Sequence, residues 1–187
     1  MGPSVDRAVR ALRAGGLVVY PTDTLLGLGA RADDRDAVAR LRRAKGRPGV
    51  QPMSAAVSSL EEIELYAELS APARAWVRRH LPGPFTVLVR PTARARRELS
   101  AAIAGAPTLG LRVPDHPVAR ELARRTGPVV ATSANRHGRP PARSAAAARA
   151  AFGRTVAVYL TARPPPSGRP SQLVDLTGTS PRWVARP

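Results

Sequence analysis

A single lysine stands out among the residues of this chain that could do chemistry. Of its thirty Lys and Arg residues, Lys45 is the only lysine and the others are arginine. A compact ammonium and a planar guanidinium are not interchangeable where a flexible cation must lie among oxygen atoms. Gly46 and Pro48 follow it and are typical of a helix end. Lys45 could therefore act in a site or simply cap the negative end of its helix, and these residues alone leave both roles open.

Two groups of polar residues each follow an apolar run that is typical of a buried strand. They are Thr-Asp-Thr at 22–24 and Ser-Ala-Asn at 133–135. Ligands of α/β sheets bind where strands end, and hydroxyl and backbone N–H groups there can hold a phosphate or an amino acid. The alternative in both places is a polar turn, in which Asp23 or Asn135 bonds its own backbone.

The remaining candidates are guanidinium groups. Arg112 stands just before Pro114, where it could bind a carboxylate through two hydrogen bonds, although other arginines could do the same. The three histidines lack the spacing of a zinc site, and no Ser-His-Asp set is evident. Hydroxyls, guanidiniums and one ammonium suit the binding and neutralisation of phosphate oxygens.

Composition limits the class of protein. The 187 residues suit one domain, and the absence of cysteine excludes disulfides and thiolate chemistry. The net charge of +17 attracts polyanions such as nucleotides or RNA, but it could equally be a solvated arginine coat. No apolar run approaches the length of a membrane span, so we expect no membrane association and a cytoplasmic location.

The elements that must position these residues alternate along the chain. Because some expected strands follow one another directly, the pattern favours an α/β (α+β) fold with a mixed sheet. A proline-rich segment at 163–170 is expected to form a surface loop or lid. The expected strands are 17–20, 25–30, a segment leading to 57, 85–89, 109–113, 129–132, 156–160, 173–176 and 183–186, and the expected helices include 35–44, 59–69, 70–81, 94–103, 117–125 and 142–151.

Six short motifs, taken together and in order, resemble those of the YrdC family, the threonylcarbamoyl-AMP synthases. The resemblance covers nearly the whole chain, and its specificity comes from the six motifs being in register. They are Tyr-Pro-Thr-Asp-Thr with Gly-Leu-Gly-Ala (20–30), Ala-Lys-Gly-Arg-Pro (44–48), Pro-Gly-Pro-Phe-Thr (82–86), Leu-Arg-Val-Pro (111–114), Thr-Ser-Ala-Asn (132–135) and Pro-Ser-Gln-Leu-Val-Asp (170–175).

The resemblance implies a twisted mixed sheet flanked by helices around a large basic cleft, in the short form with one domain over residues 1–187. It implies synthesis of threonylcarbamoyl-AMP from L-threonine, bicarbonate and ATP with Mg²⁺, and release of pyrophosphate. The product would serve the threonylcarbamoyladenosine modification of tRNA through a separate transferase. Binding of tRNA or double-stranded RNA by this chain is a further expectation.

The resemblance also implies roles for individual residues. Lys45 and Arg47 would neutralise the phosphate and carbamate oxygens, and no protein ligand to the metal is assigned. The substrate-binding residues would be Thr22, Arg112 and Ser171 for threonine, with Ser133, Asn135 and Arg186 joining Lys45 and Arg47 for ATP.

The sequence departs from the family pattern at several positions. Leu26 replaces an aromatic residue, Ala56 a histidine and Gln172 a small hydroxyl residue, and the end of the chain around Arg186 matches loosely. Substrate selectivity and the role of Arg186 are the expectations that these departures affect. Two other functions stay open: a basic RNA-binding protein without catalysis, and a carbamoyl-adenylate-forming domain of the hydrogenase-maturation type.

Overall fold

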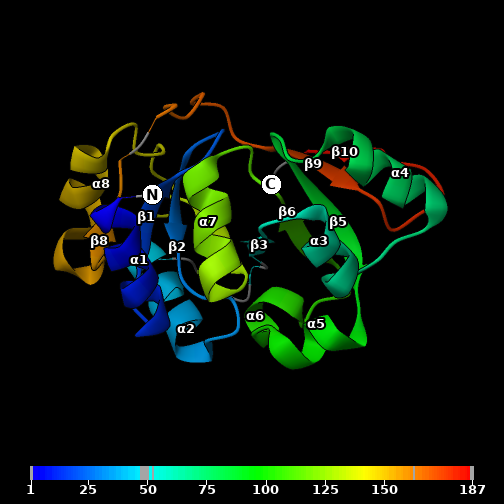
Figure 1. Ribbon diagram of the computed structural model, residues 1–187, viewed down its shortest axis with the longest axis horizontal. Helices are drawn as coiled ribbons and strands as arrows, with labels where there is room; N and C mark the ends of the chain where they lie inside the picture. Colours follow the sequence, from blue (N-terminus) through cyan, green and yellow to red (C-terminus); the bar gives the residue numbers. More distant parts are fainter. Residues whose placement is uncertain (1, 47–50, 52, 162, 186–187) are drawn as a thin grey trace.

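A ten-stranded mixed sheet with helices on both faces forms the body of the protein (Figure 1). The computed structural model describes residues 2–46, 51, 53–161 and 163–185. The strand order is β10-β9-β5-β6-β3-β7-β2-β1-β8, with β4 paired to β5 beside this path. The pairs β1/β8, β3/β6 and β5/β9 are parallel and the others are antiparallel. The prediction of a mixed α/β sheet is confirmed.

The elements have the following bounds. The strands are β1 Val18–Pro21, β2 Leu26–Gly29, β3 Ser54–Ala56, β4 Ala67–Glu68, β5 Phe85–Pro91, β6 Leu109–Arg112, β7 Val129–Ser133, β8 Val158–Tyr159, β9 Gln172–Asp175 and β10 Arg182–Val184. The helices are α1 Pro3–Arg13, α2 Arg35–Lys45, α3 Leu60–Tyr66, α4 Ala71–His80, α5 Ala93–Glu98, α6 Ala101–Ala104, α7 Pro117–Thr126, α8 Ala145–Phe152 and the 3-10 turn η1 Gly153–Thr155.

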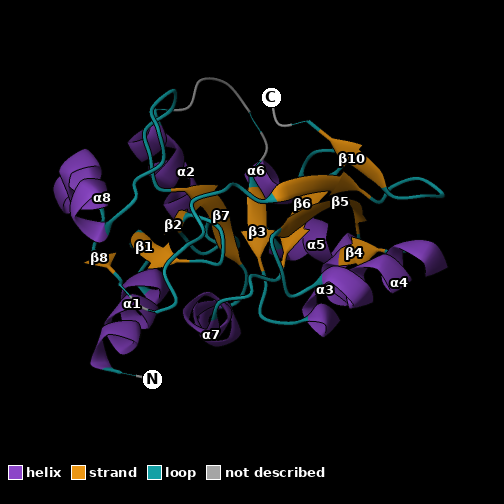
Figure 2. Ribbon diagram, turned by 90° about the horizontal axis from the view of Figure 1, so that it is seen from above, coloured by secondary structure: helices purple, strands orange, loops and turns teal. Residues whose placement is uncertain are grey.

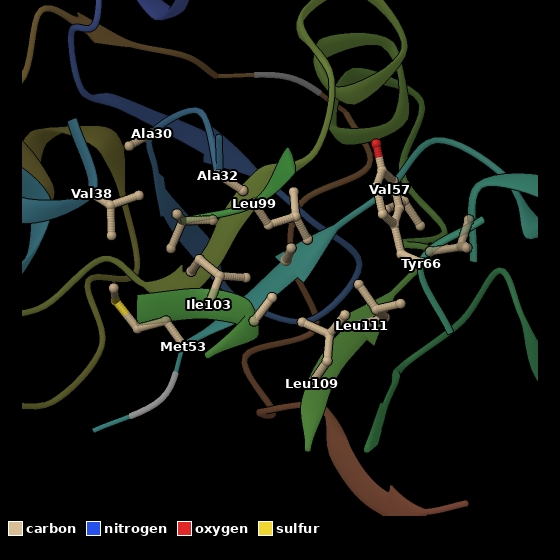
Figure 3. Close-up of a cluster of buried hydrophobic side chains, with 14 of the residues drawn as sticks. Ala30, Ala32, Val38, Met53, Val57, Tyr66, Leu99, Ile103, Leu109 and Leu111 are labelled. Carbon is tan, nitrogen blue, oxygen red and sulfur yellow. The ribbon is translucent and has the colours of Figure 1, made fainter. Parts of the chain in front are cut away.

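The two faces of the sheet carry separate apolar clusters. Successive side chains of a strand point to opposite faces, so Val18 and Tyr20 of β1 pack with α1 and α7, whereas Val19 packs with α2. Figure 2 shows α1 and α7 on one side of the strands and α2 and α6 on the other. The larger cluster includes Ile103, Met53 and Leu109, which are labelled in Figure 3.

The helix expected at 142–151 begins at Ala145, because the Ser144 side chain caps it there. Two other predicted helices differ as well. The helix expected at 94–103 is instead α5 and α6, because the Ser100 side chain caps a new helix at Ala102 N and its backbone N–H donates to Ala32 O at 2.8 Å. The helix expected to reach 69 ends at Tyr66, because the chain turns there into β4 beside β5. In both places a tertiary backbone contact overrides local helix propensity.

The glycines of β2 make room for a buried tyrosine. A Cβ atom at Gly27 would lie 2.9 Å from the Tyr20 ring, and one at Gly29 would lie 2.7 Å from it. Val19 pairs with Leu28 between them, so the Tyr20 ring lies across the glycine face of the neighbouring strand. The packing of the ring therefore explains the Gly-Leu-Gly spacing. The polar residues at 22–24 lie in the connection between these two strands.

Within the described part of the chain, no helix has the length and hydrophobicity that crossing a bilayer requires.

Candidate active site

Lys45 ends α2 with its side chain directed to the end of β7. Its Nζ donates to Ser133 O at 2.6 Å, to Asn135 O at 2.9 Å and to Asn135 Oδ1 at 3.4 Å. Only 2% of the residue is exposed. The helix begins at an Asp34 side-chain cap and ends at Gly46, whose φ of 65° is left-handed and favours glycine. These bonds hold the ammonium against β7, which a role in capping its own helix does not explain.

The turn after β7 fixes both partners of Lys45. Ser133 Oγ donates to Asn135 Oδ1 at 2.5 Å, and the Asn135 amide donates to Arg136 O and Arg139 O. The turn expected here, in which the Asn135 side-chain oxygen bonds its own backbone, does not form, because that oxygen accepts from Ser133 and Lys45 and the backbone N–H of His137 donates to Lys45 O. These bonds orient Asn135 Oδ1 toward Lys45, so the segment after β7 builds the cation site.

The group after β1 has a compact hydrogen-bond network of its own. Thr22 Oγ1 lies 3.0 Å from Thr24 Oγ1 and donates to Leu25 O at 2.7 Å. Thr22 and Thr24 are both buried. The Thr22 oxygen also accepts from the backbone N–H groups of residues 24 and 25. The polar turn expected here is thus built by Thr22 rather than by Asp23.

Arg112 joins this network from the end of β6. Its Nη2 donates to Asp23 Oδ1 at 2.6 Å and its Nη1 donates to Thr24 Oγ1 at 3.0 Å. Side-chain exposure is 7% for Arg112 and 13% for Asp23. Burial lowers the pKa of Arg112, and the Asp23 carboxylate opposes that shift because it favours the charged form. The predicted carboxylate clamp is occupied by a carboxylate of the protein itself.

A cavity of ≈ 450 Å³ joins three of the predicted residues. Thr22, Ser133 and Ser171 all line it, and Arg112 lies behind Thr22 through Thr24. Ser171 is buried with its Oγ 2.8 Å from Thr86 Oγ1. The described residues that line the cavity are uncharged, so the expected large basic cleft stays a prediction. The other lining residues are Tyr20, Leu25, Leu26, Gly27, Met53, Ser54, Leu88, Thr108, Gly110, Ala131, Thr132, Pro141, Pro170 and Leu173.

The proline-rich loop at 163–170 lies against the Asp23 turn. Ser167 N donates to Asp23 O at 3.1 Å, and Gly168 N donates to Thr24 O at 2.8 Å. At its start, Pro164 O lies 3.1 Å from Nε2 of the fully buried His116. These bonds tie the loop to the site, and its movement as a lid stays a prediction.

A second cavity of ≈ 410 Å³ adjoins the first. Leu25, Leu26 and Pro141 line both, and the second adds Arg143 and Arg169 at its wall. The two hollows therefore combine hydroxyl groups, apolar walls and guanidiniums around one region, which suits an elongated anionic ligand.

The structure brings the main predicted groups together and adds several contacts that the sequence did not indicate. Arg47 and Arg186 lie outside the described residues. Thr86 belongs to a quoted motif, yet nothing in the sequence indicated its bond to Ser171. Tyr20 lines the cavity and donates to Val130 O at 3.2 Å, and burial raises its pKa to about 12. Its glycine neighbours were the signal that could have indicated a buried ring.

Chemically, the site offers hydroxyl groups that line the cavity and the Lys45 ammonium, which contacts the lining residue Ser133. The ammonium can neutralise an oxyanion, and the hydroxyls can orient a small polar substrate. No nucleophile–base pair occurs among the described lining residues, so the arrangement fits reactions in which the substrates supply the nucleophile and the protein supplies position and charge.

Comparison with known proteins gives consistent matches. Residues 10–187 match the Sua5/YciO/YrdC family profile, described as "Telomere recombination". A Mycobacterium tuberculosis protein is 44% identical over 181 residues, covering 96% of this chain and 82% of that protein. The threonylcarbamoyl-AMP synthase of Chromohalobacter salexigens is 42% identical over 181 residues, covering 94% of this chain and 96% of the relative.

Solved structures show the same fold. The structure of P. abyssi Sua5 complexed with L-threonine superposes with a TM-score of 0.87 at 31% identity, covering 96% of this chain. This chain spans about half, 52%, of that protein's length. Full-length HypF in the phosphate- and nucleotide-bound form has a TM-score of 0.81 at 25% identity, and the match covers 29% of its length.

Proposed function

The chain belongs to the Sua5/YciO/YrdC family, and from this premise we propose that it synthesises L-threonylcarbamoyl-AMP. The substrates are L-threonine, bicarbonate or CO2, and ATP taken as its Mg²⁺ complex, and pyrophosphate is released. The observation that carries the proposal is the position of Lys45. It is buried against Ser133 and Asn135, and Ser133 lines the same cavity as Thr22 and Ser171.

The reaction needs two steps that this site can support. The threonine amine adds to CO2 to form a carbamate and releases a proton. A carbamate oxygen then attacks the α-phosphorus of ATP, and the bond to pyrophosphate breaks. Negative charge develops on phosphate oxygens during this step, where a fixed ammonium stabilises it. We assign this role to Lys45 together with Arg47, which lies outside the described residues.

Threonine and ATP bind to different groups of residues in the site. Thr22, Ser171 and Arg112 hold threonine, and its carboxylate is bound by Arg112. Ser133 and Asn135 bind the nucleotide beside Lys45. Arg186, also outside the described residues, would contact ATP from the end of the chain.

The product is the precursor of the threonylcarbamoyladenosine modification of tRNA, and we propose that a downstream transferase completes this modification. We also propose a cytoplasmic location. The net charge of +17 supports direct binding of tRNA or another double-stranded RNA by the chain. Such binding would show a steep decrease in affinity with salt, because each neutralised phosphate releases counterions.

The decisive experiment omits each substrate in turn. Purified protein is incubated with Mg·ATP, L-threonine and labelled bicarbonate, and pyrophosphate and the labelled adenylate are quantified. We expect both products only in the complete mixture. Pyrophosphate release that does not depend on threonine would contradict the proposal.

The same assay separates the two other functions. A carbamoyl-adenylate-forming domain of the hydrogenase-maturation type would use carbamoyl phosphate, so this compound replaces threonine and bicarbonate in one reaction. Pyrophosphate release in that reaction alone would indicate a carbamoyl-adenylate-forming domain. RNA binding without pyrophosphate release in any mixture would indicate a non-catalytic basic protein.

A further inference from the structure

We propose that Asp23 and Thr24 are positioning residues, which hold the Arg112 guanidinium in the orientation that receives the carboxylate of the amino-acid substrate. This inference rests on the proposed function, because it takes Arg112 as the group that binds that carboxylate. Asp23 and Thr24 act through Arg112 rather than by contact with substrate.

The ion pair leaves donors on the guanidinium. Arginine has five N–H donors, and the described bonds of Arg112 use Nη2 toward Asp23 and Nη1 toward Thr24. Its Nε and the Asp23 Oδ2 atom are buried and have no partner among the described residues. Because Nε is buried, the N–H groups that remain for a second carboxylate are the second hydrogens of Nη1 and Nη2.

The hydroxyl of Thr24 connects Arg112 to the cavity in one direction. Thr22 donates its single hydroxyl hydrogen to Leu25 O, so the hydrogen between the two threonines belongs to Thr24. Thr24 Oγ1 in turn accepts from Arg112 Nη1. The chain of donors therefore runs from Arg112 through Thr24 to Thr22, whose side chain lines the cavity.

Backbone hydrogen bonds fix the positions of Asp23 and Thr24. The carbonyl oxygens of Asp23 and Thr24 accept from Ser167 and Gly168 of the loop at 163–170. Arg112 is set independently, because Ala56 of β3 is its register partner in the parallel β3/β6 pair. Two separately anchored segments thus meet at the guanidinium, which is the geometry that a positioning role requires.

The test uses steady-state kinetics on four variants of the whole chain. Thr24→Val removes the hydroxyl but keeps the branched shape, Thr24→Ser restores the hydroxyl, and Asp23→Asn removes the charge. Thr126→Val is the matched control, since Thr126 is a buried threonine whose hydroxyl donates to Leu122 O within α7. Thermal unfolding of each variant checks that it is folded.

We expect Thr24→Val to raise the KM for L-threonine about tenfold, because a hydrogen bond to a charged group is lost. The KM for ATP and kcat should stay within about twofold of wild type, since only the binding of the carboxylate is weakened. Thr24→Ser should recover the wild-type KM, and Asp23→Asn should raise it at least as far as Thr24→Val. The preference for L-threonine over its amide should fall in Thr24→Val, because the amide lacks the carboxylate.

Other results overturn the inference. A lower threonine KM in Asp23→Asn would show that Asp23 competes with the substrate carboxylate instead of positioning its partner. An unchanged threonine KM in Thr24→Val, or equal changes for both substrates, would also contradict it, even if Asp23→Asn fails to fold. Wild-type protein that releases no pyrophosphate with threonine contradicts the proposed function as well, whereas an active wild type with indifferent variants contradicts this inference alone.

Discussion

The two cations of the site are held in different ways. Arg112 is bound by side chains, the carboxylate of Asp23 and the hydroxyl of Thr24, in a buried network with its own counterion. Lys45 donates to two backbone carbonyl oxygens, of Ser133 at the end of β7 and of Asn135 just after it, and to the side-chain oxygen of Asn135. Asp23 balances the buried charge of Arg112. The bonds of Lys45 hold its ammonium beside Ser133, where we propose that negative charge develops on phosphate oxygens. We therefore expect substitutions in the Arg112 network to reduce stability and substitution of Lys45 to reduce the rate of the reaction.

The largest effect should follow from breaking the buried ion pair. Asp23→Asn leaves the Arg112 guanidinium buried without a counterion, so the free energy of unfolding should fall by about 3–5 kcal/mol. Urea unfolding at pH 7 measures it. Combining Asp23→Asn with Arg112→Met should cost less than the sum of the single changes, because the unpaired charge is then gone. Additive costs would show that the two side chains do not depend on each other.

Removing the ammonium should act mainly on catalysis. Lys45→Met should lower kcat for pyrophosphate release by about 10²–10³-fold, as for other groups that stabilise developing charge. Arg43→Met is the matched control, because Arg43 is an exposed cation in the same last turn of α2. A Lys45→Met protein that forms the adenylate at the wild-type rate would refute the assignment of Lys45.

The packing of the Tyr20 ring against β2 can be tested through its glycines. Gly29→Ala places a Cβ atom 2.7 Å from the Tyr20 ring and 2.8 Å from Val129 Cγ1, both in packed surroundings. Such overpacking should cost about 1–3 kcal/mol of unfolding free energy. Adding Tyr20→Leu should recover part of this loss, and chemical denaturation of the single and double variants checks it. No recovery would show that the ring is not the obstacle.

The smallest effect concerns the anchor of the loop at 163–170. Burial lowers the pKa of His116, so its unfolded state binds a proton more readily than its folded state. Stability should therefore be unaffected by this group above the ordinary value of 6.5 and should fall as the pH decreases below it. The slope cannot exceed about 1.4 kcal/mol per pH unit for one proton.

Unfolding measured between pH 7 and pH 5 should show this slope in wild type and lose it in His116→Gln. His137→Gln is the control, because His137 is exposed on the surface. An equal slope in all three proteins would assign the pH dependence to other groups.

The sequence predicted the mixed sheet and most elements because caps and breaks are local signals. Ser70 caps α4 and Gly46 ends α2 as expected. The division of the helix expected at 94–103 depends on Ser100 N bonding Ala32 O, a contact across the fold that no local pattern encodes. Local sequence signals thus predict which elements form, whereas tertiary contacts determine where some of them end.

The site was predicted unevenly for a similar reason. Lys45 could be singled out because it is the only lysine, and the structure places it against Ser133 and Asn135. The pairing of Arg112 with Asp23 could not be predicted, because the residues are 89 positions apart and many arginines were equal candidates. A residue type that occurs once can be singled out from the sequence. To identify the site residue among many arginines, one needs to know which strands the fold brings together.

The sheet ends on both sides in very short strands, and this affects how copies of the protein meet. β8 has two residues and β10 has three, so each exposes few unpaired backbone groups to a neighbouring chain. Short edges are one way in which natural sheets avoid joining edge to edge, and the charge of +17 adds mutual repulsion. Concentrated solutions should therefore resist fibril growth by strand addition, even though the sheet itself has ten strands.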